Sequence, residues 1–315
     1  MARDPAHRAL ISTAGAGRTE DMIHLPSRAR AALYGLALFL CLPVELCADP
    51  LLGAIRGIER DLKARVGFYM HDLHTAEVVA YAQDDRFALN STFKVLACGA
   101  LLHRVERGAA RLTDTVRLQD VQVVDYSPAI IAHRRAGQSE VTLGEACGMM
   151  LSVSDNTAAN IVLRAIGGPE GLTTYLRSIG DSVTRLDRWE TALNSAVPGD
   201  LRDTTTPRAI AHSVRRLILE DTLAPASRAI LRAWLADHRV ADALFRAALP
   251  STWSIEDRTG AGGHGSRSIV AVLYPPDRQP IVASLFITET QADFDARNAA
   301  VARIGAALVA HVTRE

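Results

Sequence analysis

The chain has 315 residues, of which 48% are hydrophobic and 22% are charged, a composition typical of a globular protein and not of a disordered one. Lysine plus arginine and aspartate plus glutamate are equal at 35 each, so the protein has no overall charge that would draw it to nucleic acid or an anionic membrane. No two of the four cysteines share a C-x-x-C spacing, which excludes the common zinc-binding pattern.

The first predicted segment is an export signal. A pair of arginines precedes an apolar stretch, residues 31–42, that is too short to span a bilayer comfortably, and a small residue, Ala48, offers a cleavage point. We therefore expect residues 1–48 to be an N-terminal extension and signal peptide, with translation starting at Met22, and the mature chain to be periplasmic or secreted. A short membrane anchor is the alternative. Two of the four cysteines leave with the signal.

The first elements predicted in the mature chain are two strands, and helices follow them. Residues 66–72 and 77–81 are two predicted strands joined by a short polar turn. From residue 92 to residue 235, apolar residues recur three and four apart, which is the period of a helix. The clearest predicted helices are 92–106, 143–151, 157–166 and 207–219.

Near the C-terminus the pattern returns to that of strands. Residues 253–260, 268–274 and 281–288 are predicted strands, and a turn containing two prolines separates the last two. A final amphipathic helix is predicted from Phe294 to Val312.

Strands at both ends with helices between them predict an α/β fold, in the form of an α+β sandwich. We expect one antiparallel sheet flanked by helices, with an inserted all-helical lobe, in a single domain of residues 49–315. The α/β lobe is predicted to comprise residues 49–85 and 237–315, and the helical lobe residues 86–236. A cleft between two such lobes is a usual place for a small-molecule site.

The first motif whose residues could take part in catalysis is an S-x-x-K, from Ser91 to Lys94. It lies at the predicted start of a helix, with Asn90 as the expected cap. Residues three apart on a helix share a face, so the Ser91 hydroxyl and the Lys94 ammonium are expected within hydrogen-bonding reach. A buried amine with a depressed pKa helps to remove the serine proton, and the helix N-terminus favours the developing negative charge. Taken alone, an S-x-x-K occurs frequently by chance.

Two further motifs follow along the chain. The triplet Ser154-Asp155-Asn156 precedes a predicted helix, where the default role of Asp or Asn is capping. The triplet 258–260, Arg-Thr-Gly, lies in a predicted strand, where a glycine indicates either a close approach to the backbone or a loose turn or bulge. In this order and at these separations, the three motifs resemble the S-x-x-K, S-D-N and K-T-G set of class A β-lactamases and penicillin-binding proteins.

A fourth feature resembles class A specifically. The stretch from Arg188 to Asn194 is similar to the part of the class A omega loop that carries the deacylating carboxylate. The resemblance implies that Glu190 is the general base and Asn194 its hydrogen-bonding partner for the water that attacks the acyl-enzyme. Penicillin-binding proteins of related fold lack this element and stay acylated. Arg188 and Asp203 match the positions of a salt bridge that closes the loop in the family.

The resemblance covers essentially the whole mature chain and implies further roles. Cys98 and Cys147 match the paired cysteines of many class A enzymes, which predicts a disulfide. Tyr126 resembles the aromatic wall of the family's cleft, with core packing as the alternative. Arg267 is similar to an arginine that helps to bind the substrate carboxylate, with an ordinary surface arginine as the alternative.

The implied reaction is hydrolysis of the β-lactam ring in two stages, which confers resistance. Ser91 attacks the lactam carbonyl after its proton is removed by Lys94 or by Glu190 through a water. The backbone N–H groups of Ser91 and Ala261 form the oxyanion hole, and Ser154 passes a proton to the lactam nitrogen. Glu190 then activates the water that releases the product. The residues implied in substrate binding are Asn156, Tyr126, Arg258, Thr259, Gly260 and Arg267.

Three departures from the family pattern affect these expectations. Arg258 stands where most members have lysine, which resembles the carbenicillin-hydrolysing subgroup with an R-T-G triad. That resemblance implies that the substrates are penicillins, including carboxypenicillins. The Arg258 guanidinium stays charged and binds a carboxylate as a planar fork, so recognition of the substrate anion is expected to survive. Thr191 replaces a proline that often follows the deacylating glutamate, which leaves the local peptide geometry open. Asn90 replaces the cysteine of some carbapenem-hydrolysing members, so carbapenem hydrolysis is not predicted.

The expected partner is a small-molecule β-lactam, and no metal or organic cofactor is expected. We expect a monomer with no nucleic-acid partner and no stable membrane partner. One alternative is a cell-wall peptidase or penicillin-binding protein of the same fold, which releases its acyl group slowly. Another is a non-enzymatic β-lactam sensor, which carries transmembrane helices beyond the N-terminus. Glu190 and Asn194 argue against both alternatives.

Overall fold

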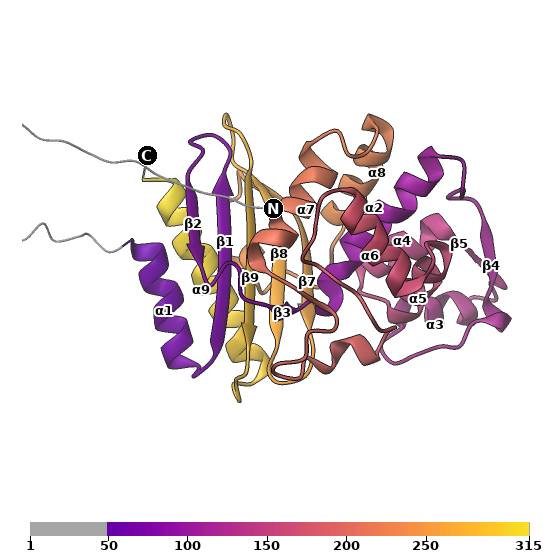
Figure 1. The fold of residues 1–315 in the computed structure, drawn as a ribbon, viewed down its shortest axis with the longest axis horizontal. Helices are drawn as coiled ribbons and strands as arrows, with labels where there is room; N and C mark the ends of the chain where they lie inside the picture. The colour runs from indigo at the N-terminus through magenta and orange to yellow at the C-terminus, as the bar shows by residue number, and fades with distance from the viewer. Residues whose placement is uncertain (1–48, 315) are drawn as a thin grey trace, which may run out of the picture. The chain divides into compact units, whose positions relative to one another are not determined.

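The computed structural model describes residues 49–314, and the predicted signal peptide lies outside the described residues. Five strands form one antiparallel sheet in the order β2-β1-β9-β8-β7 (Figure 1). The strands are β1 (Arg65–Asp72), β2 (Val78–Tyr81), β7 (Ser254–Ala261), β8 (Arg267–Tyr274) and β9 (Ile281–Thr288). Arg65 of β1 pairs with Thr288 of β9, so segments from both ends of the described chain share one sheet. The predicted fold class is confirmed.

Alternating side chains of the sheet enter two different apolar cores, because successive residues of a strand point to opposite faces. Phe68 of β1 belongs to the core beneath α1 (Pro50–Asp61) and α9 (Phe294–Val312). Tyr69, the next residue, belongs to the core that α7 (Pro207–Leu219) and the other helices complete. Figure 1 shows α1 and α9 on one side of the sheet and most of the helices on the other.

The remaining helices surround α2 (Phe93–Glu106), whose residues 93–102 are all buried. A helix that is apolar around its whole circumference is stable only inside a core, and α2 therefore lies at the centre of the helical part. The other helices of this part are α3 (Pro128–Arg135), α4 (Leu143–Ser152), α5 (Asn156–Ala165), α6 (Gly168–Ser178) and α8 (Pro225–Ala236). The short elements are η1 (Asn90–Thr92), η2 (Leu118–Asp120), η3 (Ala192–Ser195), η4 (Phe245–Ala248), β3 (Phe87–Ala88), β4 (Thr115–Arg117), β5 (Glu140–Thr142) and β6 (Thr204–Thr205).

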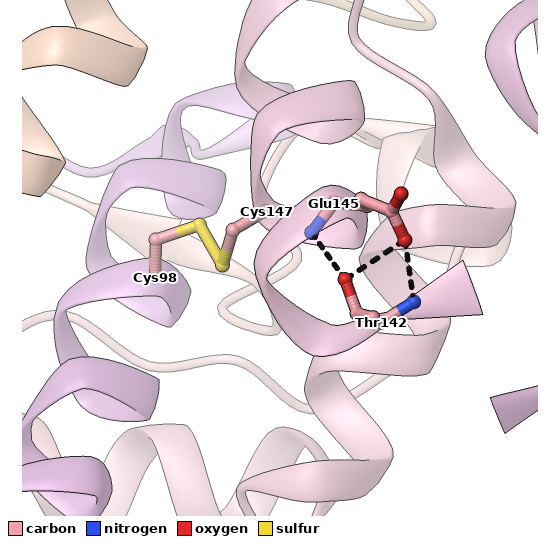
Figure 2. The surroundings of a disulfide bond; sticks show 4 residues. All are labelled: Cys98, Thr142, Glu145 and Cys147. Carbon is pink, nitrogen blue, oxygen red and sulfur yellow. Dashed lines mark hydrogen bonds between the residues drawn. A yellow bond between two sulfur atoms is a disulfide. The ribbon is translucent and has the colours of Figure 1, made fainter. Parts of the chain in front are cut away.

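A disulfide joins the central helix to a neighbouring one (Figure 2). Cys98 of α2 is bonded to Cys147 of α4, with their Cα atoms 5.9 Å apart, which confirms the predicted pair. α4 begins with a capping box: the Thr142 hydroxyl accepts a hydrogen bond from the Glu145 backbone N–H at 3.1 Å, and the Glu145 carboxylate accepts one from the Thr142 backbone N–H at 2.8 Å. The helix that carries Ser91 at its entry is thereby tied to the helix that leads to Ser154.

The predicted helix cap at Asn90 is wrong. The chain enters α2 through the 3₁₀ turn η1, and the N-cap position is Thr92, whose side chain makes no capping bond. Asn90 lies in this turn, before the N-cap position, so its side chain can make another contact. Its Nδ2 donates to Ser266 Oγ at 3.1 Å, beside the turn between β7 and β8.

Within residues 49–314, no helix is both long enough and apolar enough to cross a membrane.

Candidate active site

The predicted site residues meet in one cleft of about 300 Å³. Strand β7 and the entry to α2 contribute to its wall, together with the starts of α5 and α9. Lys94, Glu190 and Arg258 are buried next to this wall. The cleft is lined by Ser91, Tyr126, Ser154, Asn156, Asn194, Val240, Thr259, Gly260, Ala261, Arg267 and Phe294.

Ser91 and Lys94 are linked through Ser154. The Ser154 hydroxyl donates to Ser91 Oγ at 3.1 Å and accepts a hydrogen bond from Lys94 Nζ at 3.2 Å. Among the described residues, Ser91 and Lys94 make no direct hydrogen bond with each other, although their spacing on one helix face predicted that they would be within reach. Lys94 instead donates to the Ser154 carbonyl at 2.8 Å and to Asn156 Oδ1 at 2.7 Å. The three residues form one buried hydrogen-bond network at the nucleophile.

The Lys94 ammonium is completely buried, and the Glu190 carboxylate lies beside it. Lys94 Nζ is 3.1 Å from Glu190 Oε1, and both side chains have an exposed fraction of 0%. Burial lowers the pKa of Lys94 to about 8, against the neighbouring Glu190 carboxylate, which raises it. The amine therefore carries its proton at neutral pH and loses it in a mildly alkaline solution. Such a group is suited to proton transfer.

Glu190 is held from both its side chain and its backbone. Asn194 Nδ2 donates to Glu190 Oε2 at 2.6 Å. Asn160, on α5, accepts from the Glu190 backbone N–H and donates to its carbonyl, both at 3.0 Å. The peptide bond between Glu190 and Thr191, whose geometry the replacement of proline by Thr191 had left open, is cis. The carboxylate thus has a defined position beside the Lys94 amine and the cleft.

The loop that carries Glu190 is closed by an ion pair. The Arg188 guanidinium binds the carboxylate of Asp203, which is fully buried, as the sequence predicted. The other oxygen of Asp203 accepts from the backbone N–H groups of Asp187 at 2.7 Å and Arg188 at 2.9 Å. A buried carboxylate with both oxygens bonded fixes the two ends of the loop relative to each other.

Arg258 is buried with an exposed fraction of 1%, and most of its donors are bound by the protein. Its Nε donates to the Ser91 carbonyl at 3.1 Å, Nη1 donates to the Leu151 carbonyl at 3.2 Å and lies 2.9 Å from His238 Nε2, and Nη2 donates to Ser154 Oγ. Burial lowers the pKa of Arg258 to about 10, so the guanidinium stays charged at neutral pH. Because a guanidinium has five N–H donors, these four contacts leave one N–H of Nη2 without a partner among the described residues.

Gly260 permits the close approach of β7 to the nucleophile. A Cβ atom at this position would lie 2.9 Å from Asn90 Cβ and 3.0 Å from the Ser91 backbone nitrogen. Gly262 is equally confined, since its Cβ would meet Asn90 Oδ1 at 2.3 Å. The close-approach interpretation of the strand glycine therefore describes the structure better than a loose bulge. It places the backbone of Ala261 on the same cleft wall as Ser91.

The rim of the cleft combines an exposed tyrosine with a buried arginine. Tyr126 has an exposed fraction of 59%, which excludes the alternative of core packing. Arg267 is only 4% exposed, which excludes an ordinary surface arginine. Its Nε donates to Asn298 Oδ1 at 2.8 Å, its Nη1 donates to the Gly260 carbonyl at 3.0 Å, and its guanidinium lies 5.0 Å from the centre of the Phe294 ring. Burial lowers the pKa of Arg267 to about 10, so it too remains a cation at neutral pH.

Three residues of this site have a left-handed backbone, with φ of 44° at Asn90, 56° at Tyr126 and 64° at Ser154. Each such conformation in a residue other than glycine costs about 1–3 kcal/mol and persists only where its surroundings enforce it. The local backbone is therefore shaped by the requirements of the site.

The sequence interpretation missed Asn160 and His238. Asn160 is a polar residue in an otherwise apolar stretch of α5, one turn after Asn156, and that pattern was a usable signal. His238 follows α8 in a segment without a motif, and no signal in the sequence connects it with Arg258. Within the described part of the chain, no group of three histidine, cysteine, aspartate or glutamate side chains is arranged to hold a metal ion.

Comparisons with known proteins agree with this geometry. The model of a family described as a beta-lactamase enzyme family matches residues 51–312. The chain is 47% identical over 274 residues to beta-lactamase AER-1 of Aeromonas hydrophila, covering 87% of this chain and 90% of that protein. A solved structure of the ancestral (GNCA) beta-lactamase class A is 45% identical, with a TM-score of 0.79, and the match covers 82% of this chain and 99% of that one. The crystal structure of the chromosome-encoded beta-lactamase of Vibrio parahaemolyticus is 40% identical, with a TM-score of 0.79, and the match covers 84% of this chain and 100% of that one.

Proposed function

Because this chain belongs to the class A β-lactamase family and is therefore a hydrolase of the β-lactam ring, we propose that it acts through an acyl-enzyme on Ser91. The observation that carries this proposal is the hydrogen-bond network around Ser154 Oγ. This atom donates to Ser91 and accepts from both Lys94 and Arg258. A hydroxyl held between the nucleophile and two cations is placed to move a proton.

In the acylation stage, Ser91 Oγ attacks the lactam carbonyl carbon and gives up its proton. We propose that Glu190, through a water, takes this proton at neutral pH, because Lys94 holds its own proton below a pKa of about 8. Lys94 takes over as the base above that pH. Ser154 then passes its proton to the lactam nitrogen as the C–N bond breaks, and it is reprotonated by Lys94. Glu190, whose Oε1 lies 3.1 Å from Lys94 Nζ, passes to Lys94 the proton that it took from Ser91 and becomes a carboxylate again.

The negative charge on the carbonyl oxygen requires two N–H donors. We propose the backbone N–H groups of Ser91 and Ala261, which line the same cleft wall where Gly260 brings β7 close to Ser91. The loss of one such donor typically costs about 100-fold or more in rate. Asn156, Tyr126 and Thr259 also line this cleft and are proposed to orient the substrate.

In the deacylation stage, Glu190 removes a proton from the water that attacks the ester carbonyl, and this proton passes to Ser91 Oγ as the ester C–O bond breaks. Asn194 supports this role, because it donates to one Glu190 oxygen and lines the cleft. We propose that the catalytic domain is the exported part of the chain, residues 49–315, and that it consists of an α/β lobe and an inserted helical lobe. We propose that it acts as a monomer in the periplasm or outside the cell.

The substrate carboxylate is proposed to bind at Arg267, Thr259 and Arg258, and the substrates to include carboxypenicillins. Arg258 supplies one free N–H donor and its charge, whereas Arg267 lines the open cleft directly. A cleft with two buried cations favours dianionic penicillins over monoanionic ones. The Arg258→Gln variant, which removes one of these cations, should therefore lose more kcat/KM toward carbenicillin than toward benzylpenicillin. Equal losses would contradict the carboxypenicillin proposal.

The main test is steady-state hydrolysis of benzylpenicillin by the purified protein beside its Glu190→Ala variant. The parent should turn over many times, and the variant should accumulate an adduct on Ser91 that intact-mass measurement and peptide mapping detect. Glu140→Ala, which makes the same change at an exposed glutamate on β5, is the matched control and should turn over like the parent. If the parent itself only accumulates the adduct, the protein is a penicillin-binding protein or peptidase.

A further inference from the structure

A histidine behind the site has both ring nitrogens in contact with strand β7. His238 has an exposed fraction of 3% and is not among the residues that line the cleft. Its Nδ1 is 3.2 Å from Asp257 Oδ2, and its Nε2 is 2.9 Å from Arg258 Nη1. The other oxygen of Asp257 accepts from Arg246 Nε at 3.0 Å. The four side chains form a buried chain of contacts that ends at Ser154 Oγ.

The donors and acceptors in this chain determine the state of the histidine ring. A guanidinium has no acceptor, so Nε2 of His238 must accept from Arg258 and carry no proton. A carboxylate accepts, so Nδ1 must carry the proton and donate to Asp257. Only the neutral Nδ1–H tautomer satisfies both contacts. The second proton of an imidazolium would point its N–H at the N–H of Arg258.

The His238 acceptor helps to fix the orientation of the Arg258 guanidinium, because the other nitrogen atoms of this group bind Ser91 and Ser154 at the site. Nη1 is shared between His238 and the Leu151 carbonyl, Nη2 donates to Ser154 Oγ, and Nε donates to the Ser91 carbonyl. The guanidinium is planar, so the position of Nη1 sets the position of Nη2. The loss of the His238 acceptor leaves a buried N–H of Nη1 unsatisfied and removes one of the contacts that hold the guanidinium plane against Ser154.

We propose that His238, as the neutral Nδ1–H tautomer oriented by Asp257, is a positioning residue that holds Arg258 against Ser154 for proton transfer to the lactam nitrogen. This inference rests on the proposed role of Ser154. It adds a requirement for a neutral histidine to a site whose proposed proton transfers involve Lys94 and Glu190.

The charged surroundings of His238 give this requirement a pH dependence. Arg258 and Asp257 face it from β7, and Arg246 faces Asp257 from η4. Its neighbours Asp237 and Arg239 bind each other at the surface. Burial lowers the pKa of His238, and the nearby Arg258 charge acts in the same direction, against Asp257. As pH falls below that lowered pKa, the ring gains a proton, Arg258 is displaced and activity declines.

The first test is the tautomer itself, which is independent of activity. Long-range ¹H–¹⁵N correlation spectra of the histidine-labelled parent at pH 7.5 should show His238 with Nδ1 protonated and Nε2 bare, assigned by its absence in His238→Gln. Titration should give a midpoint below 6.5, the ordinary value. An Nε2–H tautomer or an imidazolium at pH 7.5 would overturn the proposal, whatever the enzyme hydrolyses.

The second test compares two variants kinetically. His238→Phe keeps the ring volume without an acceptor and should lower kcat/KM for benzylpenicillin about tenfold, as the loss of one buried hydrogen bond predicts. His238→Gln supplies an amide oxygen and should retain more activity, with the acid limb of its pH profile shifted to lower pH. His212→Gln, which changes a histidine bonded to Tyr69 at 3.0 Å, should leave that limb in place.

A third arm separates positioning from general stability. In an Arg258→Lys background the fork is absent, so His238→Phe should cost much less than in the parent. Thermal unfolding of each variant shows whether it is folded. Equal losses in both backgrounds, or an acid limb unchanged in His238→Gln, would overturn the proposal. Absence of hydrolysis by the parent would instead contradict the proposed function and leave the tautomer measurement decisive for His238.

Discussion

The two faces of the sheet differ in what they bury. Under α1 and α9 the apolar core includes Phe68, Leu285 and Ile304, and the polar pair Arg267–Asn298 is buried at its edge. At the end of β7 on the other face, Lys94, Glu190 and Arg258 are buried just as deeply. Burying an unpaired polar group costs several kcal/mol, so such groups occur where each one has partners. The comparison teaches that the first face provides stability and the second provides chemistry.

Strand β7 takes part in both regions. Ile255 belongs to the apolar core under α9, whereas Arg258 and Gly260 point to the opposite face toward Ser91 and Asn90. One rigid strand therefore connects a stable layer to the reactive site. The predictions below ask whether the two regions can be damaged separately.

The largest expected effect is the loss of turnover in Ser91→Ala. Removal of the nucleophile should lower kcat for benzylpenicillin by about 10⁴-fold or more, since no covalent route remains. The midpoint of thermal unfolding should stay close to that of the parent, because a single small side chain is shortened. Substantial turnover by the variant, measured spectrophotometrically, would show that Ser91 is not the nucleophile.

The second effect concerns the disulfide that supports the helical part. Cys98→Ala with Cys147→Ala opens a loop between residues 49 apart in sequence, which costs about 4 kcal/mol in the chain-entropy model. Urea unfolding at fixed pH should show this loss of unfolding free energy relative to the parent. Reduction of the parent under native conditions should give a similar change, and no change in either case would contradict the prediction.

The third prediction damages the apolar face alone. Ile304→Ala, at a position with 0% exposure on α9, should lower the free energy of unfolding by about 3 kcal/mol through lost burial and a residual cavity. At a temperature where the variant is folded, kcat/KM should match that of the parent. Arg303→Ala changes the exposed neighbour and should cost less than about 1 kcal/mol. A large loss of kcat/KM in folded Ile304→Ala would refute the separation of the two regions.

The smallest effect is a pH dependence of the chemical face. The pKa of Lys94 is lowered to about 8, with Glu190 holding it up against burial. In Glu190→Ala, that support is lost and the Lys94 pKa should fall further. The amine should then act as the base, so the acylation rate constant should rise with pH through a midpoint below 8. Stopped-flow or quenched-flow mass measurements check this, and a pH-independent rate would exclude Lys94 as the base.

The sequence alone predicted the family of this protein and many of its longer elements, although α1 was not among the predicted helices. The spacing of apolar residues predicted the helix over 207–219 and the strand over 281–288 with the bounds that the structure has. This worked because each pattern is local: a strand or a helix repeats within its own few residues. The order of the S-x-x-K, S-D-N and R-T-G motifs likewise predicted which residues meet, because the family that carries them has one fold.

Only the tertiary structure decided how the polar side chains are paired. In the structure Asn90 does not cap the helix but donates to Ser266 in the β7–β8 turn, and Asn160 donates to the backbone carbonyl of Glu190. It also bound Arg258 to Ser91, Leu151, Ser154 and His238, which lie 20 to 167 positions away along the chain. Hydrogen bonds act over about 3 Å and need correct angles, and no local pattern records which distant donors and acceptors folding will bring together.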